Sequence, residues 1–210
     1  MNSRIDYWFL DGRELKIDLG CGQNKKHGYI GVDNADIPEV DVSSDVLTFL
    51  RSLPDSVVDE IYSRHVMEHL DDFILVQSEI YRVLKKSGVQ KVIVPHFSSP
   101  FYYSDPTHVQ FFGLYSFCYF SENEYYRRNV PTFYDSNLRF VILSVRLGFR
   151  NSRFPLRNLI GKYILEPLFN ASAGAQEVYE SFFSSFFNCT EISYELAKRQ
   201  QTQSSNASHS

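Results

Sequence analysis

The chain has 210 residues, of which 43% are hydrophobic and 22% are charged, and its formal net charge at pH 7 is -4. This length and composition are typical of one soluble globular domain with a sizeable core. The negative charge and the lack of a long basic run argue against nucleic acid as a substrate, because a phosphate backbone is bound through clustered Lys and Arg side chains. We therefore expect a small molecule or a glycan as the substrate.

The sequence predicts neither a membrane span nor a secretion signal. It has no run of about 18 apolar residues and no charged-then-apolar leader, so we expect a cytoplasmic protein. The three cysteines, Cys21, Cys118 and Cys189, lack paired spacing and fit reduced thiols. None has an activating neighbour in the sequence, and we expect none to act as a nucleophile.

Near the N-terminus, two short apolar runs are joined by a glycine-rich turn. Leu15–Leu19 is the first predicted strand, and Tyr29–Val32 is the second, ended by Asp33. Gly20 and Gly22 permit positive φ angles and a close approach by a ligand. In an open parallel sheet ligands bind beyond the carboxyl ends of the strands, so the two glycines and the aspartate should converge on one crevice. A carboxylate at that place suits ribose hydroxyls, which can donate hydrogen bonds to it.

Two features of this stretch disfavour NAD as the ligand. Lys25 stands where the third glycine of the dinucleotide fingerprint would fall. Only about ten residues separate Gly22 from Asp33, against the ~20 expected after that fingerprint, so there is little room for a full crossover helix. A Gly-x-Gly turn also occurs without any ligand.

Two more strands are predicted before residue 70. A short third strand should end near Asp45, whose carboxylate could accept a hydrogen bond from an adenine amino group. Asp45 could instead cap the helix that follows, since aspartate is a favoured N-cap residue. Val57–Tyr62 is the fourth strand, and it places His65 at its carboxyl end, on the crevice side.

A helix and a buried strand come next. Asp71 and Asp72 suit the first turn of a helix, and Lys85, Lys86 and Gly88 are expected to close it. Its apolar positions recur at helical spacing: Phe73, Val76, Ile80, Val83 and Leu84. Val89–Val94 is the fifth strand, stopped by Pro95.

The segment His96–Phe120 is rich in aromatic residues and turn formers. A connection of this length usually carries function or is disordered, and its many rings argue against disorder. We therefore place the acceptor pocket here. Tyr102, Tyr103, Phe111 and Phe112 could stack on a sugar or shield a cation, or they could fill the core.

The last part of the chain predicts two strands around a helical insertion. Phe140–Leu147 is the sixth strand and Glu191–Ala197 the seventh, while the aromatic residues 156–187 between them are helical. The insertion contains two phenylalanine pairs, Phe182 and Phe183, and Phe186 and Phe187. We expect these pairs to face the core or a partner subunit, and in the second case the protein would be a homodimer. Contact with a membrane surface is the alternative. Residues 1–198 are expected to form one domain, and residues 199–210 a disordered tail.

This order of elements resembles the class I S-adenosylmethionine (SAM) methyltransferases, particularly the type 11 group. Asp18, Gly20, Cys21 and Gly22 resemble the first motif of that family. Further similar strings are the turn at Asp59, HVMEHL after the fourth strand, EIYRVLKKSG at the helix end and VPHF after the fifth strand. The string SDPTHVQFFGLYSF, residues 104–117, resembles a subset associated with bacterial surface polysaccharides and related glycans.

The resemblance implies an α/β, Rossmann-like fold with a seven-stranded, mostly parallel sheet, flanking helices and an aromatic helical insertion before the last strand. It implies SAM as the cofactor. The first motif and Asp33 would hold the methionine and ribose parts, Asp45 and Val46 would contact adenine, and His65 would lie near the methionine end. The expected activity is O-methylation of a sugar or glycan precursor. Methylation of another small metabolite on oxygen, nitrogen or carbon is an alternative, as is an inactive SAM-binding partner subunit.

A hydroxyl acceptor needs a base within hydrogen-bond reach, because its proton must leave during attack. His96, Asp105 and His108 lie in or beside the aromatic segment. We favour His108, because a neutral imidazole is available near pH 7 and Asp105 could orient it across a turn. Alternatively, Asp105 only starts a turn and His108 caps or packs.

One string resembles a metal motif. His65, Glu68 and His69 match the H-x-x-E-H pattern of certain zinc peptidases, which requires both histidines on one continuous helix. Because His65 should lie at a strand end, we expect no hydrolase and no metal ligands here.

Overall fold

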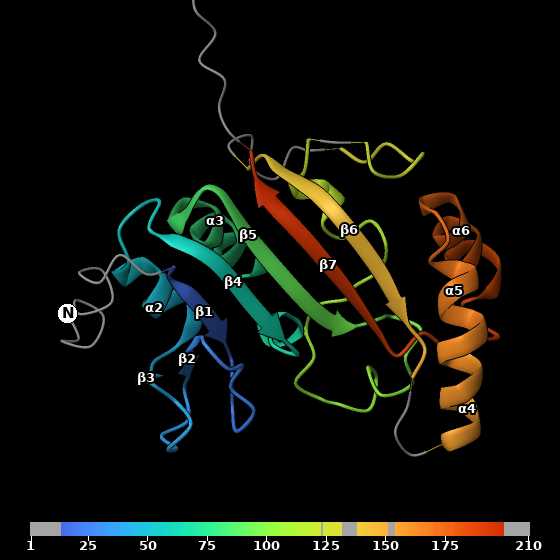
Figure 1. Ribbon diagram of the computed structural model, residues 1–210, viewed down its shortest axis with the longest axis horizontal. Coiled ribbons are helices and arrows are strands. Elements are labelled where there is room, and N and C mark those ends of the chain that lie inside the picture. The colour runs from blue at the N-terminus through green and yellow to red at the C-terminus, as the bar shows by residue number, and fades with distance from the viewer. Residues whose placement is uncertain (1–13, 123, 132–137, 151–153, 200–210) are drawn as a thin grey trace, which may run out of the picture.

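The fold is known from a computed structural model that describes residues 14–122, 124–131, 138–150 and 154–199. The predicted N-terminal part of the domain up to residue 13 and the predicted tail beyond Arg199 lie outside the described residues. The described residues contain a seven-stranded sheet with the order β3-β2-β1-β4-β5-β7-β6 (Figure 1). The strands are β1 (Lys16–Leu19), β2 (Ile30–Asp33), β3 (Val42–Ser43), β4 (Val58–Arg64), β5 (Leu84–Pro95), β6 (Phe140–Gly148) and β7 (Glu191–Lys198).

The first five strands are parallel, and β7 pairs antiparallel with both β5 and β6. The predicted mostly parallel sheet of Rossmann-like type is therefore confirmed. Because the parallel strands run in one direction, the ends of β1, β2, β4 and β5 form a common carboxyl edge, at the lower side of Figure 1.

The fifth strand is longer than the sequence pattern predicts. The helix α3 (Phe73–Val83) ends before the two lysines that were expected to close it, and β5 begins at Leu84. Leu84 is fully buried and pairs with Val58, so its apolar side chain belongs to the sheet and not to the helix.

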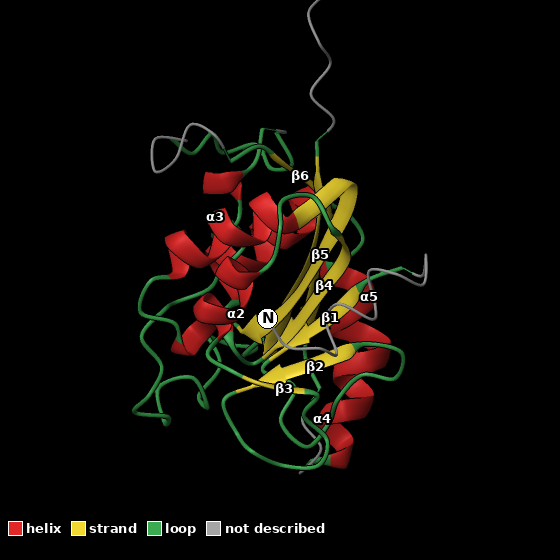
Figure 2. Ribbon diagram, turned by 90° about the vertical axis from the view of Figure 1, so that its left-hand side faces the viewer, coloured by secondary structure: helices red, strands yellow, loops and turns green. Residues whose placement is uncertain are grey.

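Helices lie on both sides of the sheet (Figure 2). The helices α2 (Val46–Ser52) and α3 lie on one side, where Phe73 of α3 packs edge-on against Phe112, Phe117 and Phe120 of the aromatic segment. That segment therefore contributes to the core as well as to the surface. Tyr102 and Phe112 are buried, whereas Tyr103 and Phe111 are 67% and 62% exposed.

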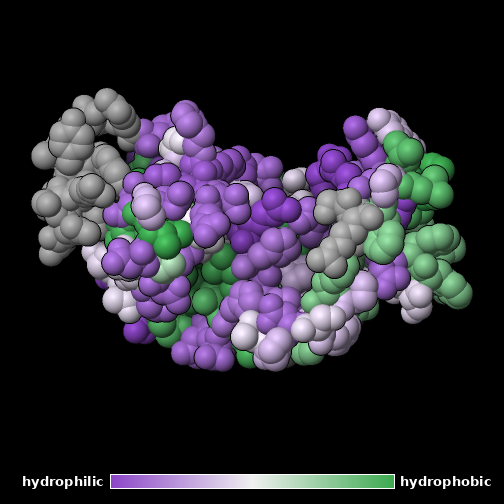
Figure 3. Space-filling view, turned by 90° about the horizontal axis from the view of Figure 1, so that it is seen from below, coloured by the Kyte–Doolittle hydropathy of each residue, from purple (hydrophilic) through white to green (hydrophobic). Residues whose placement is uncertain are grey.

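The predicted helical insertion stands beside the end of β6, on the other side of the sheet (Figures 1 and 2). It consists of α4 (Pro155–Ile160), a π-helical turn (Gly161–Leu165), α5 (Glu166–Phe169), α6 (Ala173–Val178) and a second π-helical turn (Tyr179–Phe183). Phe182 and Phe186 are 70% and 77% exposed, so they do not face the core of the described chain. Apolar side chains gather on this side of the molecule in Figure 3. The described helices include none that is long and apolar enough to cross a bilayer.

Candidate active site

The loop after β1 has two glycines in the left-handed region, with φ of 65° at Gly20 and 47° at Gly22. The N–H of Gly20 donates to the carbonyl of Val32 at 2.7 Å, which holds the loop against the end of β2. A Cβ at Gly20 would lie 2.2 Å from Cγ2 of Val66, whereas a Cβ at Gly22 would meet nothing within 4 Å. Gly20 is therefore required by packing, and Gly22 leaves open space for a ligand.

Two carboxylates shape the same loop. Asp33 at the end of β2 accepts a hydrogen bond from the N–H of Gly22 at 2.9 Å. Asp18 in β1 is buried and accepts one from the N–H of Lys26 at 2.8 Å. Burial raises the pKa of Asp18, although the backbone of Lys26 opposes this effect. Asp18 thus holds the loop at Lys26 from the buried side, and the half-buried Asp33 holds it at Gly22, at the open end or mouth of the loop.

The short connection between β1 and β2 contains no helix in the described residues. Lys25 forms an ion pair with Asp41 at 2.9 Å, and Asp41 also accepts a hydrogen bond from the N–H of Gly31 at 2.8 Å. These contacts pin the connection to the strand beside it. Burial raises the pKa of Cys21 in this loop to about 11, so its thiol is neutral and a poor nucleophile near pH 7.

Asp45 is the N-cap of α2. Its Oδ1 accepts a hydrogen bond from the N–H of Thr48 at 3.0 Å, so the capping interpretation is confirmed. Val46, the first residue of the helix, is buried. Contact of this pair with adenine stays a prediction.

His65 directly follows β4 and has a φ of 56°, which is uncommon for a residue other than glycine. Its two ring nitrogens lie 3.4 Å from Glu191 and 3.3 Å from Glu68. These two carboxylates, Glu191 first, raise the pKa of His65 to about 9, so the ring is cationic near pH 7. The next residue, Val66, packs against Gly20 of the glycine loop, and His65 itself lines the cavity described next.

A cavity of about 880 Å³ lies at the carboxyl edge, the side seen in Figure 3. Residues that follow β4 and β5 form one wall, and residues of α4 and its π-helical turn form another. The polar and charged residues of its lining are Arg64, His65, Glu68, His69, Ser99, Asp105, His108, Arg150, Asn158, Lys162, Thr190 and Glu191, and Phe101, Leu159 and Tyr163 contribute apolar surface.

His108 lies in this lining with a defined orientation. Its Nδ1 is 2.8 Å from the carbonyl oxygen of Tyr102, which can only accept, so Nδ1–H donates and Nε2 carries the lone pair. Asp105 does not orient the ring as expected. Its Oδ2 is 3.7 Å from Nε2, beyond hydrogen-bond range, and its Oδ1 accepts from the N–H and the hydroxyl of Thr107 in a tight turn.

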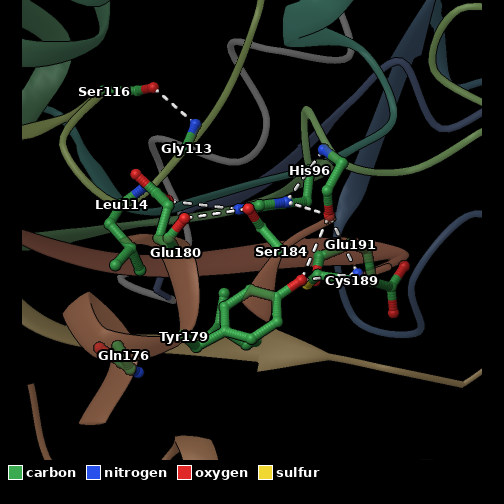
Figure 4. A network of polar contacts seen from close by, with 12 residues as sticks. His96, Gly113, Leu114, Ser116, Gln176, Tyr179, Glu180, Ser184, Cys189 and Glu191 are labelled. Atoms are coloured by element: carbon green, nitrogen blue, oxygen red, sulfur yellow. Dashed lines mark hydrogen bonds and ion pairs between the residues drawn. The ribbon is translucent and has the colours of Figure 1, made fainter. Parts of the chain in front are cut away.

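His96 is fully buried and is not part of the cavity lining. Its Nδ1 contacts the hydroxyl of Ser98 at 2.8 Å and its Nε2 contacts Oε2 of Glu180 at 3.3 Å (Figure 4). Glu180 also accepts a hydrogen bond from the N–H of Leu114 at 2.7 Å. Both nitrogens of His96 are thus occupied, and the residue joins the end of β5 to the insertion. It does not offer a base to an acceptor in the cavity.

His69, the last residue of the H-x-x-E-H string, does not share a helix with His65 as the zinc peptidase motif requires. A short 3-10 helix (Met67–His69) follows His65, so the two histidines are not on one continuous helix. His69 instead contacts the hydroxyl of Thr107 at 2.9 Å and packs edge-on against His108, with ring centroids 4.8 Å apart.

Several residues of the cavity were not expected from the sequence. Glu191 pairs with His65 from the start of β7, Arg150 follows β6, and Lys162 and Tyr163 come from the insertion. Their positions depend on how the insertion folds back over the carboxyl edge. The sequence signal for them was the place of the insertion, directly before β7, which pairs with both β5 and β6.

The family model described as a methyltransferase domain (Methyltransf_11) matches residues 17–90, which include β1, β2, β4 and the start of β5. A search of curated proteins finds no significant match.

Solved structures share the fold at low sequence identity. A SAM-dependent methyltransferase from Archaeoglobus fulgidus has 19% identity and a TM-score of 0.57, covering 93% of this chain and 90% of its own. Phosphoethanolamine N-methyltransferase 2 from Haemonchus contortus, in complex with SAM, has 15% identity and a TM-score of 0.53, covering 95% of this chain and 53% of its own. The [4+2]-cyclase SpnF has 16% identity and a TM-score of 0.51, covering 93% of this chain and 80% of its own.

Proposed function

We propose that this chain is a SAM-dependent methyltransferase that methylates a hydroxyl group of a sugar or glycan precursor. The family match over residues 17–90 and the shared fold support this proposal. The observation that carries the proposal is the Nε2 lone pair of His108 in the wall of the cavity. The same wall contains His65, and the next residue, Val66, lies against Gly20 of the glycine loop. A neutral imidazole with a fixed tautomer is suited to remove a proton from a hydroxyl.

The glycine loop has the features that the cofactor requires. Gly22 leaves open space where a side chain would block a ligand, and Asp33 lies at the mouth of the loop, where ribose hydroxyls could donate to it. When bound, SAM supplies a methyl group on a positively charged sulfur. The loop would hold the methionine part, and Asp45 and Val46 would contact the adenine.

The remaining groups would bind and orient the acceptor. Holding the acceptor oxygen in line with the methyl group can lower the barrier by several kcal/mol, because the entropy of bringing the two together is lost on binding. Phe101 and Tyr163 offer apolar surface to a sugar face, and the polar lining offers hydrogen bonds to its hydroxyls. His108 would accept the proton through Nε2 while its Nδ1–H remains bound to Tyr102.

A second candidate acceptor is a small metabolite that carries a phosphate or carboxylate. Arg64, Arg150 and Lys162 all line the cavity, although Arg64 also pairs with Glu191 at 3.2 Å and Arg150 with Glu166 at 2.9 Å. Lys162 from the insertion could contact such a group, or the phosphates of a nucleotide-linked sugar.

An acceptor screen tests the proposal. The full chain is incubated with SAM and separate pools of free sugars, nucleotide sugars and phosphorylated amines, and S-adenosylhomocysteine (SAH) and methylated products are measured by mass spectrometry. We expect a product methylated on oxygen in a sugar pool. Turnover only with amines would favour the second candidate, and SAH binding without turnover in any pool would favour an inactive partner subunit.

A further inference from the structure

We propose that Glu68, His69 and His108 bind a divalent transition-metal ion in the wall of the cavity. One potential ligand atom from each of these residues lies within 4.8 Å of the other two. Glu68 and His69 follow β4, whereas His108 comes from the aromatic segment after β5. The cluster is thus assembled from two parts of the chain that are about 40 residues apart in sequence.

Hydrogen bonds leave one nitrogen of each histidine available. His108 donates from Nδ1 to the carbonyl of Tyr102, so its Nε2 has a lone pair. The hydroxyl of Thr107 donates to Asp105 at 2.6 Å and so can accept from Nδ1–H of His69 at 2.9 Å, which leaves the Nε2 lone pair of His69 free as well. Histidine ligands of metals commonly donate their other N–H to a carbonyl or another oxygen in this way.

The carboxylate of Glu68 provides an independent observation. Glu68 is fully buried, and its Oε2 has no hydrogen-bond partner among the described residues. Its other oxygen, Oε1, lies 3.3 Å from Nδ1 of His65. A buried carboxylate oxygen without a partner is costly, and a bound cation would compensate it.

The donor set indicates the class of metal. Two imidazole nitrogens and one carboxylate favour Zn²⁺ or a similar first-row ion over Mg²⁺ or Ca²⁺, which prefer all-oxygen ligands. Three protein ligands leave at least one coordination position open, as in catalytic zinc sites. Because all three residues line the cavity, that position would face the acceptor.

The role of the metal rests on the proposed function. A hydroxyl group bound at the open position would have a lowered pKa, because the metal ion would stabilise its deprotonated form. Its proton would pass to the carboxylate of Asp105, which also lines the cavity. The oxygen would then form a bond to the methyl carbon, and the electron pair of the broken carbon–sulfur bond would stay on sulfur. In this metal-loaded form His108 is a ligand and Asp105 takes the proton.

Metal titration of the full chain tests the site. The chain is stripped with a chelator and titrated with Zn²⁺ by calorimetry, and separately with Co²⁺, whose visible absorption reports coordination by nitrogen and oxygen. The variants are Glu68→Gln, His69→Ala and His108→Ala. The matched control is His27→Ala, which removes an exposed histidine of the β1–β2 loop that does not line the cavity.

We expect one equivalent of Zn²⁺ per chain, with an affinity that falls about 100-fold or more in each ligand variant and is unchanged in the control. His69 is exposed, so its variant should fold even if that of the buried glutamate does not. Absence of binding, or equal binding by the parent chain and the His69→Ala variant, would overturn the site. The titration uses neither SAM nor acceptor, so the absence of metal binding would not contradict the proposed function. In the same way, the absence of SAH binding would not contradict the metal site.

Discussion

The ring of His108 is fixed by the backbone of Tyr102, whose carbonyl oxygen lies 2.8 Å from Nδ1. The two residues are six apart in one turn of the aromatic segment, so the segment itself sets the tautomer of the histidine. The free Nε2 in the cavity wall is the feature shared by the proposed base and the proposed metal site.

His108→Ala should lower turnover on a hydroxyl acceptor by about a hundredfold or more, because it removes the proton acceptor or a ligand of the metal. SAH affinity should stay nearly unchanged, since the residue lies outside the glycine loop. Steady-state kinetics and calorimetry measure the two effects, with His27→Ala as the control. Turnover equal to that of the parent chain would remove His108 from either role.

Gly22→Ala should weaken SAH binding at least about tenfold, because the added methyl group enters the open space beside the loop. Gly28→Ala is the matched control, since Gly28 also has a positive φ, of 83°, and open space around its Cβ. Each variant should lose about 1 kcal/mol of stability through backbone strain. Equal weakening of SAH binding in both would show that strain, and not occupied space, is the cause.

Asp45 has two predicted roles, and a pair of variants can separate them. Asp45→Ala should cost about 1 kcal/mol of unfolding free energy through loss of the cap on Thr48, measured by urea denaturation. Asp45→Ser keeps an oxygen that can cap the helix, but its side chain is too short to contact adenine. If the carboxylate contacts adenine, both variants weaken SAH binding, while only the alanine variant is less stable. Normal SAH affinity in the serine variant would leave Asp45 with the capping role alone.

Glu60 on β4 should make stability depend on pH. Its side chain is 14% exposed. Burial alone would raise its pKa, but the hydroxyl of Tyr29 and the ammonium of Lys91 outweigh burial and lower it. The pKa of a glutamate in the unfolded chain is about 4.3. Because the pKa of Glu60 is lower in the folded protein, the ionised side chain stabilises the fold at pH values above about 4.3. This stabilisation is lost as the pH falls through the pKa of the folded protein. Glu60→Gln should therefore cost about 1–2 kcal/mol at pH 7 and progressively less below about pH 4. A pH-independent difference in urea denaturation would contradict this assignment.

Much of the fold could be predicted because its signals are local. The alternation in β1 and β7, the glycines after β1 and the helical spacing of α3 each arise within a few neighbouring residues. The end of α3 was misplaced because pairing of Leu84 with Val58 outweighs the helical pattern.

The site was only partly predictable, because its contacts join distant segments. His96 has the local setting of a catalytic base, yet Glu180, 84 residues later, occupies one of its nitrogens in the interior. Glu68 and His69 resemble a metal motif with His65, but the structure brings them to His108 instead. Spacing along the chain does not reveal such a partner.

Calorimetric titration of the full chain with SAH is the experiment that shows whether the glycine loop and Asp33 bind the SAM cofactor. Asp33→Ala removes the carboxylate at the mouth of the loop, and Asp36→Ala, at an exposed position just after β2, is the matched control. We predict one SAH per chain for the parent and the control, and loss of binding in the Asp33 variant. If the parent chain is folded by circular dichroism and does not bind SAH, the glycine loop is not a SAM site.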